Sequence, residues 1–226
     1  DNIYDAVYKW RYEKWAAITL YGEISKWTIS GVTNMSELFK DYYDFNEDIS
    51  EWNVSTVTNM DFIFYNSTSF NQPIGKWNTN SVNSMSNMFN GSTSFNQDIS
   101  GWNVSNVTNM ESIFENNAFN KNINNWNTSN VVNMKKMFKR NITFNQPLYN
   151  WNISKVTTME SMFERSCSFN QSLYLWEERY NIYFKYDFDS ITIAIINATK
   201  EGVNTNNMFA NANSLDYYFL TGNVNQ

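Results

Sequence analysis

One pattern of apolar and polar residues recurs along most of the chain with a period of 25 residues. A tryptophan marks each copy, at Trp27, Trp52, Trp77, Trp102, Trp126, Trp151 and Trp176. The step is 25 residues throughout, except for 24 between Trp102 and Trp126. A fixed period of this length is typical of coiled repeat proteins, in which each repeat forms one turn and contacts only its neighbours. The chain is therefore expected to form one elongated unit.

The spacing of apolar residues changes within each copy. In the second copy, Trp52 and Val54 are two residues apart and polar residues flank Val54, which is the spacing of a strand. Met60, Ile63 and Phe64 follow at positions i, i+3 and i+4, which is the spacing of a helix. Each turn is therefore predicted to hold one short parallel strand and one short helix.

The start of the predicted helix has its own signal. Thr108 is followed three residues later by Glu111, and Thr157 by Glu160. This is the spacing of a capping box, in which each side chain accepts a hydrogen bond from the backbone of the other residue. The Phe-Asn pair that follows, as in Phe70 and Asn71, is expected to use its amide to bind the backbone of the same turn or the next.

The pattern divides the chain into three parts. Residues 1–22 are predicted to form a capping helix, with Asn2 at its start and a buried stripe that runs from Ile3 to Trp15. Residues 23–174 hold six repeats. Residues 175–226 are expected to be a degenerate repeat and a C-terminal cap, with two alternating apolar stretches between Tyr180 and Ile196 that predict strands.

Composition excludes several kinds of site. The chain has 16 basic and 22 acidic residues, a net charge of −6, no histidine and one cysteine. Without a basic stripe, nucleic acid is not an expected partner. Disulfides and any site built from histidine or paired cysteines are excluded, and Cys167 is interpreted as a buried thiol. Acidic residues do not recur at metal-ligand spacing, so no catalytic residue, metal or cofactor is expected. No apolar run is long enough for membrane insertion.

The repeat resembles a known family. The columns I-S-x-W-N-V-S-x-V-T-N-M-x-x-M-F and F-N-Q-x-I, which run from about Ala6 to Leu173, are similar to the BspA-like surface-repeat family in its Mycoplasma lipoprotein form. The stretch from Ala6 to Trp27 resembles the giant-virus and protist variant. The resemblance implies an α/β leucine-rich-repeat-like right-handed solenoid. It also implies a surface protein of unknown or adhesive function.

Two departures from the family matter. Many relatives carry Asp after the Trp, whereas this chain has Thr28 and then Asn at that position, so an acidic ladder is absent. No lipobox cysteine begins the chain, so lipid anchoring of the Mycoplasma type is not expected.

The outward face of the predicted sheet is the candidate interaction surface, since it is flat, polar and nearly uncharged. Its residues, called the Asn/Ser row below, are Asn53, Ser55, Asn78, Asn80, Asn103, Ser105, Asn127, Ser129, Asn152 and Ser154. The alternative is an ordinary solvated face. The Trp column is expected to lie inside the coil. Of the Asn-x-Ser/Thr sequons, Asn66, Asn90 and Asn141 are expected in accessible loops and are the possible glycosylation sites.

These observations predict a non-enzymatic structural or protein-interaction module displayed on a virion or at the extracellular cell surface. Its expected partner is a capsid or cell-surface protein. The alternative is an adhesin that binds a host glycan through the Asn/Ser row.

Overall fold

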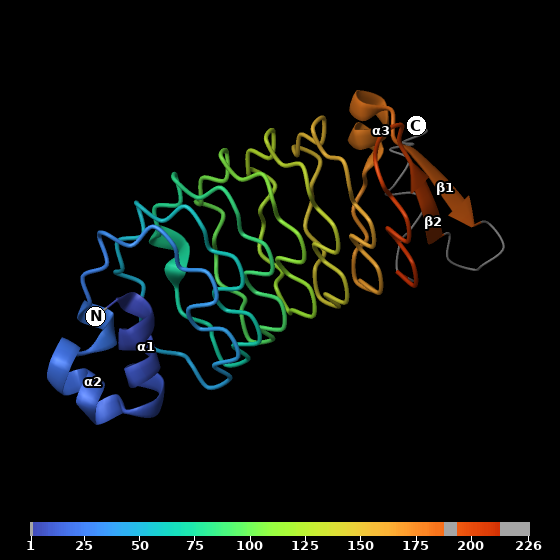
Figure 1. Cartoon of the computed structure of the whole chain (residues 1–226). Coiled ribbons are helices and arrows are strands. Elements are labelled where there is room, and N and C mark those ends of the chain that lie inside the picture. Colours follow the sequence, from blue (N-terminus) through green and yellow to red (C-terminus); the bar gives the residue numbers. More distant parts are fainter. Residues whose placement is uncertain (1, 188–193, 213–226) are drawn as a thin grey trace.

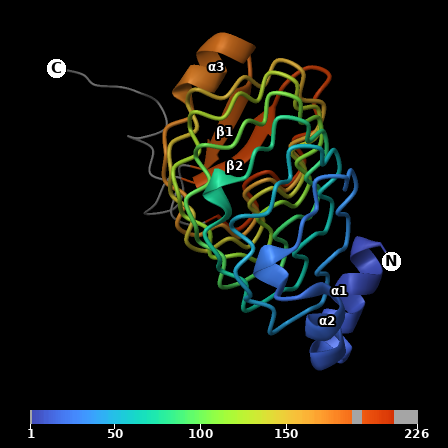
Figure 2. The same ribbon diagram turned by 90° about the vertical axis from the view of Figure 1, so that its left-hand side faces the viewer.

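The computed structural model describes residues 2–187 and 194–212. They form an elongated stack of similar turns with helices at one end and a hairpin at the other (Figure 1). Viewed from another side, the turns enclose a common interior (Figure 2). The regular elements are α1 (Ile3–Tyr12), α2 (Lys14–Tyr21), the 3₁₀ helices η1 (Ile24–Lys26) and η2 (Ile74–Lys76), α3 (Tyr174–Tyr180), β1 (Tyr183–Asp187) and β2 (Ala194–Thr199).

The N-terminal segment contains two helices where one was predicted. Asn2 caps α1, because its Oδ1 accepts hydrogen bonds from two backbone N–H groups of the first turn. The chain bends at Glu13, which has φ −137° and ψ 50°. The bend takes Trp15 off the buried stripe, so Trp15 is 84% exposed whereas Trp10 is 1% exposed. The prediction that Trp15 lies on that stripe is wrong.

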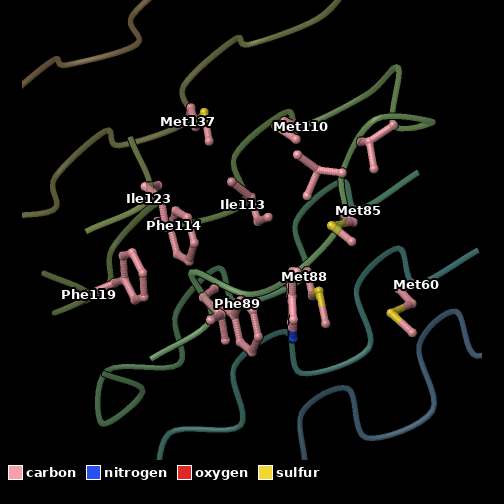
Figure 3. Close-up of a cluster of buried hydrophobic side chains, with 14 of the residues drawn as sticks. Met60, Met85, Met88, Phe89, Met110, Ile113, Phe114, Phe119, Ile123 and Met137 are labelled. Carbon is pink, nitrogen blue, oxygen red and sulfur yellow. The ribbon is translucent and has the colours of Figure 1, made fainter. Parts of the chain in front are cut away.

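Ladders of aromatic side chains fill the interior. One holds Phe39, Phe64, Phe89, Phe114, Phe138, Phe163 and Phe209, and a second holds Phe45, Phe70, Phe95, Phe119, Phe144 and Phe169. Phe64 stacks on Phe70 of its own turn at 3.8 Å and on Phe89 of the next turn at 5.6 Å between ring centroids. Methionines such as Met60, Met85 and Met110 extend this core (Figure 3). Offset aromatic stacking adds to the stability gained from burying this area.

The Trp column forms a third buried ladder. Each indole from Trp52 onwards donates its Nε1–H to a carbonyl of the preceding turn, as Trp102 does to Ile74 at 3.1 Å. Trp77 and Trp102 stack with ring centroids 6.4 Å apart. The indoles therefore bind successive turns together by a buried hydrogen bond and, in alternate pairs, by stacking as well.

The segments predicted as short helices contain no α-helix in the described residues. In residues 60–66, alternate N–H groups donate to the next turn, as from Met60 to Ser84 at 3.1 Å and from Phe62 to Ser86 at 2.8 Å. The intervening N–H groups close tight turns, as from Tyr65 to Phe62 at 3.0 Å. Residues 60–66 and their equivalents are called the Phe side below. Packed helices need 8–10 Å between their axes, and turns joined by backbone hydrogen bonds lie closer together than that. Tight turns therefore replace the predicted helices.

This backbone requires left-handed residues at two places in every turn. They are Glu37, Phe62, Asn87, Ser112, Lys136, Ser161 and Asn207 at the first place, and Asp41, Asn66, Gly91, Asn116, Arg140, Arg165 and Asn211 at the second. The proposed capping boxes are absent as well. The hydroxyl of Thr108 donates to the carbonyl of Asn83 in the preceding turn instead.

The parallel pairing lies further along each turn than predicted. Single-residue bridges join Asn34 to Asn59, Asn59 to Ser84 and onward to Asn204. The predicted strand at Trp52 and Val54 is instead a bend, closed by a hydrogen bond from Val57 to Val54. Residues 52–55 and their equivalents are called the Trp corner below. The alternation of apolar and polar residues indicates only that the side chains of Trp52 and Val54 point inward. A bend places them inward just as a strand does.

The seventh turn is split by an insertion. Trp176, in α3, continues the Trp ladder, and its indole donates to Leu148. The Phe side resumes only near Asn204, which bridges to Thr158. Between them, β1 and β2 pair as an antiparallel hairpin. The first predicted strand overlaps β1, whereas residues 188–193 of the two predicted stretches lie outside the described residues. The remainder of the predicted C-terminal cap, residues 213–226, lies outside the described residues.

Candidate interaction surface

The structure brings the Asn/Ser row together along the Trp corners. Each asparagine that follows a Trp accepts a hydrogen bond from the N–H two residues later. Asn53 accepts from Ser55 at 3.1 Å, Asn103 from Ser105 at 3.0 Å and Asn152 from Ser154 at 2.9 Å. Asn78 and Asn127 do the same with Asn80 and Ser129. The side-chain oxygens of these asparagines therefore stabilise the bend, as in an Asx turn.

Four of the five asparagines that follow a Trp in the row keep their amide NH₂ groups available for a ligand. Asn53, Asn78 and Asn127 are exposed, and Asn152 is half-buried. In the described residues these four NH₂ groups donate to no other residue, while that of Asn103 donates to Asn80 at 2.9 Å. The row is thus a line of uncharged donors. It lies on a ridge of bends and not on a sheet face, which corrects the predicted setting.

A neighbouring column escaped the sequence reasoning. Small polar side chains four residues after the Trp donate to the preceding turn, as Thr56 does to Val32 at 2.8 Å and Asn106 to Asn80 at 2.7 Å. Asn130 repeats the contact with Ser105 at 2.7 Å. The recurrence of Thr, Ser and Asn at this position was the available signal. These residues fix the row against the turn before it.

Two of the expected glycosylation sites are not accessible. Asn141 is 0% exposed and donates to the carbonyl of Phe119, and Asn90 is 8% exposed and donates to Asn87. Asn66 is half-buried and donates to Asp41 at 2.9 Å. Asn141 occupies an inward column in which Ser67 bonds a carbonyl of the preceding turn. Burial of this column removes Asn141 as an acceptor for a modifying enzyme.

The Phe-Asn pairs hold successive turns together as expected. The side-chain oxygen of Asn71 accepts from the backbone N–H of Asn96 at 3.0 Å and from the amide of Gln97 at 3.0 Å. Asn120 binds Asn145 and Gln146 in the same way. These amides therefore serve the backbone of the next turn.

Oppositely charged side chains of neighbouring turns form ion pairs. Lys139 lies 2.8 Å from Glu164, and Lys135 lies 3.1 Å from Glu160. Burial acts to raise the pKa of Glu164, but hydrogen bonds from Lys139 and Ser161 outweigh it and the pKa is lowered. Within residues 2–187 and 194–212, no group of three or more acidic or cysteine side chains is placed to hold a metal ion.

The position of Cys167 differs from the prediction. Cys167 is exposed, so its interpretation as a buried thiol is wrong. Its column faces the loop surface, where its Sγ lies 3.6 Å from the carbonyl of Arg165.

No helix among the described residues is long and apolar enough to span a bilayer.

Comparison with protein families gives one match. The profile of the Mycoplasma proteins of unknown function, DUF285, matches residues 9–118 and 98–194. The chain belongs to the DUF285 family. The two matched regions overlap and cover most of the 226 residues, which confirms that this is a Mycoplasma-type repeat protein. The match does not support the narrower giant-virus variant. Searches of curated proteins and of solved structures give no match.

Proposed function

We propose that this DUF285 protein is a non-enzymatic, surface-displayed module that binds a protein partner through the Asn/Ser row. The observation that carries the proposal is the line of outward amide groups whose oxygens are already used to hold the bends. Such donors have fixed positions, so binding a partner costs little side-chain ordering. Repeat proteins bind along extended surfaces of this kind.

We also propose that the stack is a right-handed solenoid of leucine-rich-repeat type in which tight turns replace the helix. The parallel bridges and the buried columns support this assignment. A right-handed path is expected because parallel connections take that hand. Display on a virion is a narrower form of the same proposal and rests on the resemblance of residues 6–27 alone.

A photo-crosslinking experiment on intact cells or particles tests the binding proposal. A photoreactive residue at Asn53 or Asn127 should give one discrete crosslinked product. The matched control is Thr93, which is also exposed but lies in a loop away from the Trp corners. Crosslinks at Thr93 alone, or none at any row position, would overturn the assignment of the row. Resistance of the protein to protease added outside the cells would overturn surface display.

A glycan ligand for the row is the alternative, since uncharged amides also bind sugar hydroxyls. Burial of the Trp ladder weighs against it, because Trp52, Trp77 and Trp102 are each 3% exposed and provide no stacking platform. Saturable binding on a glycan array that is lost when Asn53 and Asn127 become alanine would favour the glycan reading.

A further inference from the structure

The first turn has an incomplete edge. In the interior, the N–H of the residue six positions after each Trp donates to the preceding turn, from Thr58 to Thr33 at 2.8 Å and from Asn83 to Thr58 at 2.9 Å. Thr33 occupies this position in the first turn, and in the described part of the chain the helices α1 and α2 precede that turn. Its N–H has no hydrogen-bond acceptor among the described residues. The hydrogen bonding between turns therefore ends at Thr33, whose backbone N–H can bind a further acceptor.

Helix α1 covers only the other half of this edge. The hydroxyl of Tyr4 donates to the carbonyl of Ser36 at 3.0 Å, and Arg11 donates to that of Asp41 at 2.6 Å. Asp61 is the equivalent of Ser36 in the second turn. Its carbonyl accepts a hydrogen bond from the backbone N–H of Glu37 in the preceding turn. Tyr4 thus replaces a missing turn along residues 34–41. Helix α1 provides no equivalent hydrogen bond to residues 28–33.

A shallow groove of about 700 Å³ lies along the uncovered half. Its walls include Ile3, Tyr4 and Ala6 of α1 and Trp27, Ile29 and Val32 of the first turn. None of its lining residues carries a charge, and Asn2, Thr28, Thr33 and Asn34 supply polar groups. Its size is within the range of ligand-binding clefts. This surface is called the N-terminal groove.

The interior turns define what fits such a groove. At the equivalent place against the third turn, the second turn presents Val54 and Val57, both 0% exposed, with polar residues between them. It also presents the carbonyl of Thr58 to the N–H of Asn83. A matching ligand has two apolar side chains three residues apart, a carbonyl that faces Thr33 and no charge.

We propose that the N-terminal groove binds an extended, uncharged peptide segment with the pattern Val-x-x-Val-Thr, which adds to the stack as part of a further turn. The peptide carbonyl accepts from the N–H of Thr33, and its two apolar side chains pack on Trp27 and Val32, which line the groove and are half-buried. This is strand addition at an open backbone edge, where the backbone supplies affinity and the side-chain contacts supply selectivity. The inference is independent of the Asn/Ser row.

The test uses a labelled synthetic peptide with the sequence of residues 102–110, WNVSNVTNM, titrated into the full chain. Saturable binding is expected, and replacing both valines of the peptide by aspartate should abolish it. Gly31→Trp should weaken binding at least ten-fold, because Gly31 lines the groove and a Cβ there meets no atom within 4 Å. Gly101→Trp is the matched control, since Gly101 does not line the groove and a Cβ there has only an ordinary contact at 3.8 Å.

A second readout on the unaltered chain keeps the proposal testable if Gly31→Trp fails to fold. The amide of Thr33 should shift and become protected from hydrogen exchange when the peptide binds, while the amide of Thr58 should not change. Equal affinity for the Gly31 and Gly101 variants, or an unprotected Thr33 amide at saturation, would overturn the proposal. So would an absence of saturation at about 1 mM peptide, which corresponds to very weak binding.

Discussion

The Trp corner and the Phe side hold successive turns together by different means. On the Phe side, backbone N–H groups donate directly to the next turn at every second residue, as from Asn87 to Glu111 at 2.7 Å. At the Trp corner and in the column that follows it, side chains make the connection, as when Trp102 donates to Ile74 at 3.1 Å and Asn106 to Asn80 at 2.7 Å. The Phe side thus depends on backbone shape and the Trp corner on side-chain identity.

This difference explains which positions of the repeat keep the same residue type from copy to copy and which positions vary. The Trp corner keeps Trp and usually Asn in turn after turn, because a specific donor must reach a specific carbonyl. At the first left-handed position of the Phe side the side chain varies, and Phe62, Asn87, Ser112 and Lys136 occupy it in successive turns. Different side chains at this position therefore share the same backbone conformation.

The largest expected effect is loss of a ring from the centre of the Phe side. Phe114 is 0% exposed and stacks on Phe89, Phe119 and Phe138. Phe114→Ala should reduce the free energy of unfolding by about 3–5 kcal/mol, because it leaves a cavity in two ladders. Urea denaturation followed by tryptophan fluorescence measures this. Ile142→Ala, at a side chain 63% exposed, is the control, and equal losses for the two variants would contradict the assigned core.

The next effect concerns the hydrogen bond at the Trp corner. Trp102→Phe removes the indole donor to the carbonyl of Ile74, which then keeps only the backbone N–H of Trp77 at 3.1 Å. We expect a loss of about 0.5–1.5 kcal/mol in the free energy of unfolding, the net value of one hydrogen bond. Trp15→Phe is the matched control, because Trp15 is 84% exposed and should change stability by less than about 0.5 kcal/mol. If Trp102→Phe were neutral, the indole bond would not join the turns.

A smaller effect tests the left-handed positions of the Phe side. Lys136 has φ 54°, which is costly for a lysine and easier for asparagine, the residue at the equivalent Asn87. Lys136→Asn should stabilise the protein by about 0.5–1 kcal/mol in urea denaturation. Lys121→Asn, which makes the same change of charge outside the left-handed positions, should give no gain. A loss of stability in Lys136→Asn would argue against the turn geometry.

The smallest effect is a pH dependence from the ion pair on the Phe side. The pKa of Glu164 is lowered from its ordinary 4.5, so its pair with Lys139 contributes stability above that pH and loses it as pH falls through the lowered value. Glu164→Gln should cost about 0.5–1 kcal/mol at pH 7, since the pair is partly screened by solvent, and nothing once the pH has fallen below the lowered pKa of Glu164. Thermal unfolding across this pH range measures the difference. A constant offset at all pH values would assign the loss to packing.

The inward-facing residues could be predicted from the sequence. A large side chain at a fixed phase, such as Trp102, Met110 or Phe114, must lie inside a stack, because only there does it meet its own equivalents. The helix start at Asn2 and the strand β1 followed from capping and alternation signals. The bend at Glu13 did not, because Trp15 continues the helical spacing and only the contacts of Trp10 decide where the stripe ends.

The backbone of the Phe side could not be predicted from apolar spacing. Positions i, i+3 and i+4 point to one side in a helix, and also in tight turns whose alternate N–H groups bind a neighbour. The informative signals were Asn87 and Gly91 within the predicted helix of the third turn, since both residue types favour left-handed conformations. Six residues of the Asn/Ser row are exposed, and Ser55, Ser105, Ser129 and Asn152 are half-buried. Its setting was missed because the Asn side chains replace backbone pairing.

The direct test of the account is the partner of the Asn87 amide, measured as a through-hydrogen-bond NMR coupling. The stack predicts a coupling from the nitrogen of Asn87 to the carbonyl carbon of Glu111, one turn later, and a positive φ at Asn87. A coupling to Asn83, four residues earlier, with a negative φ would show an α-helix and contradict the account.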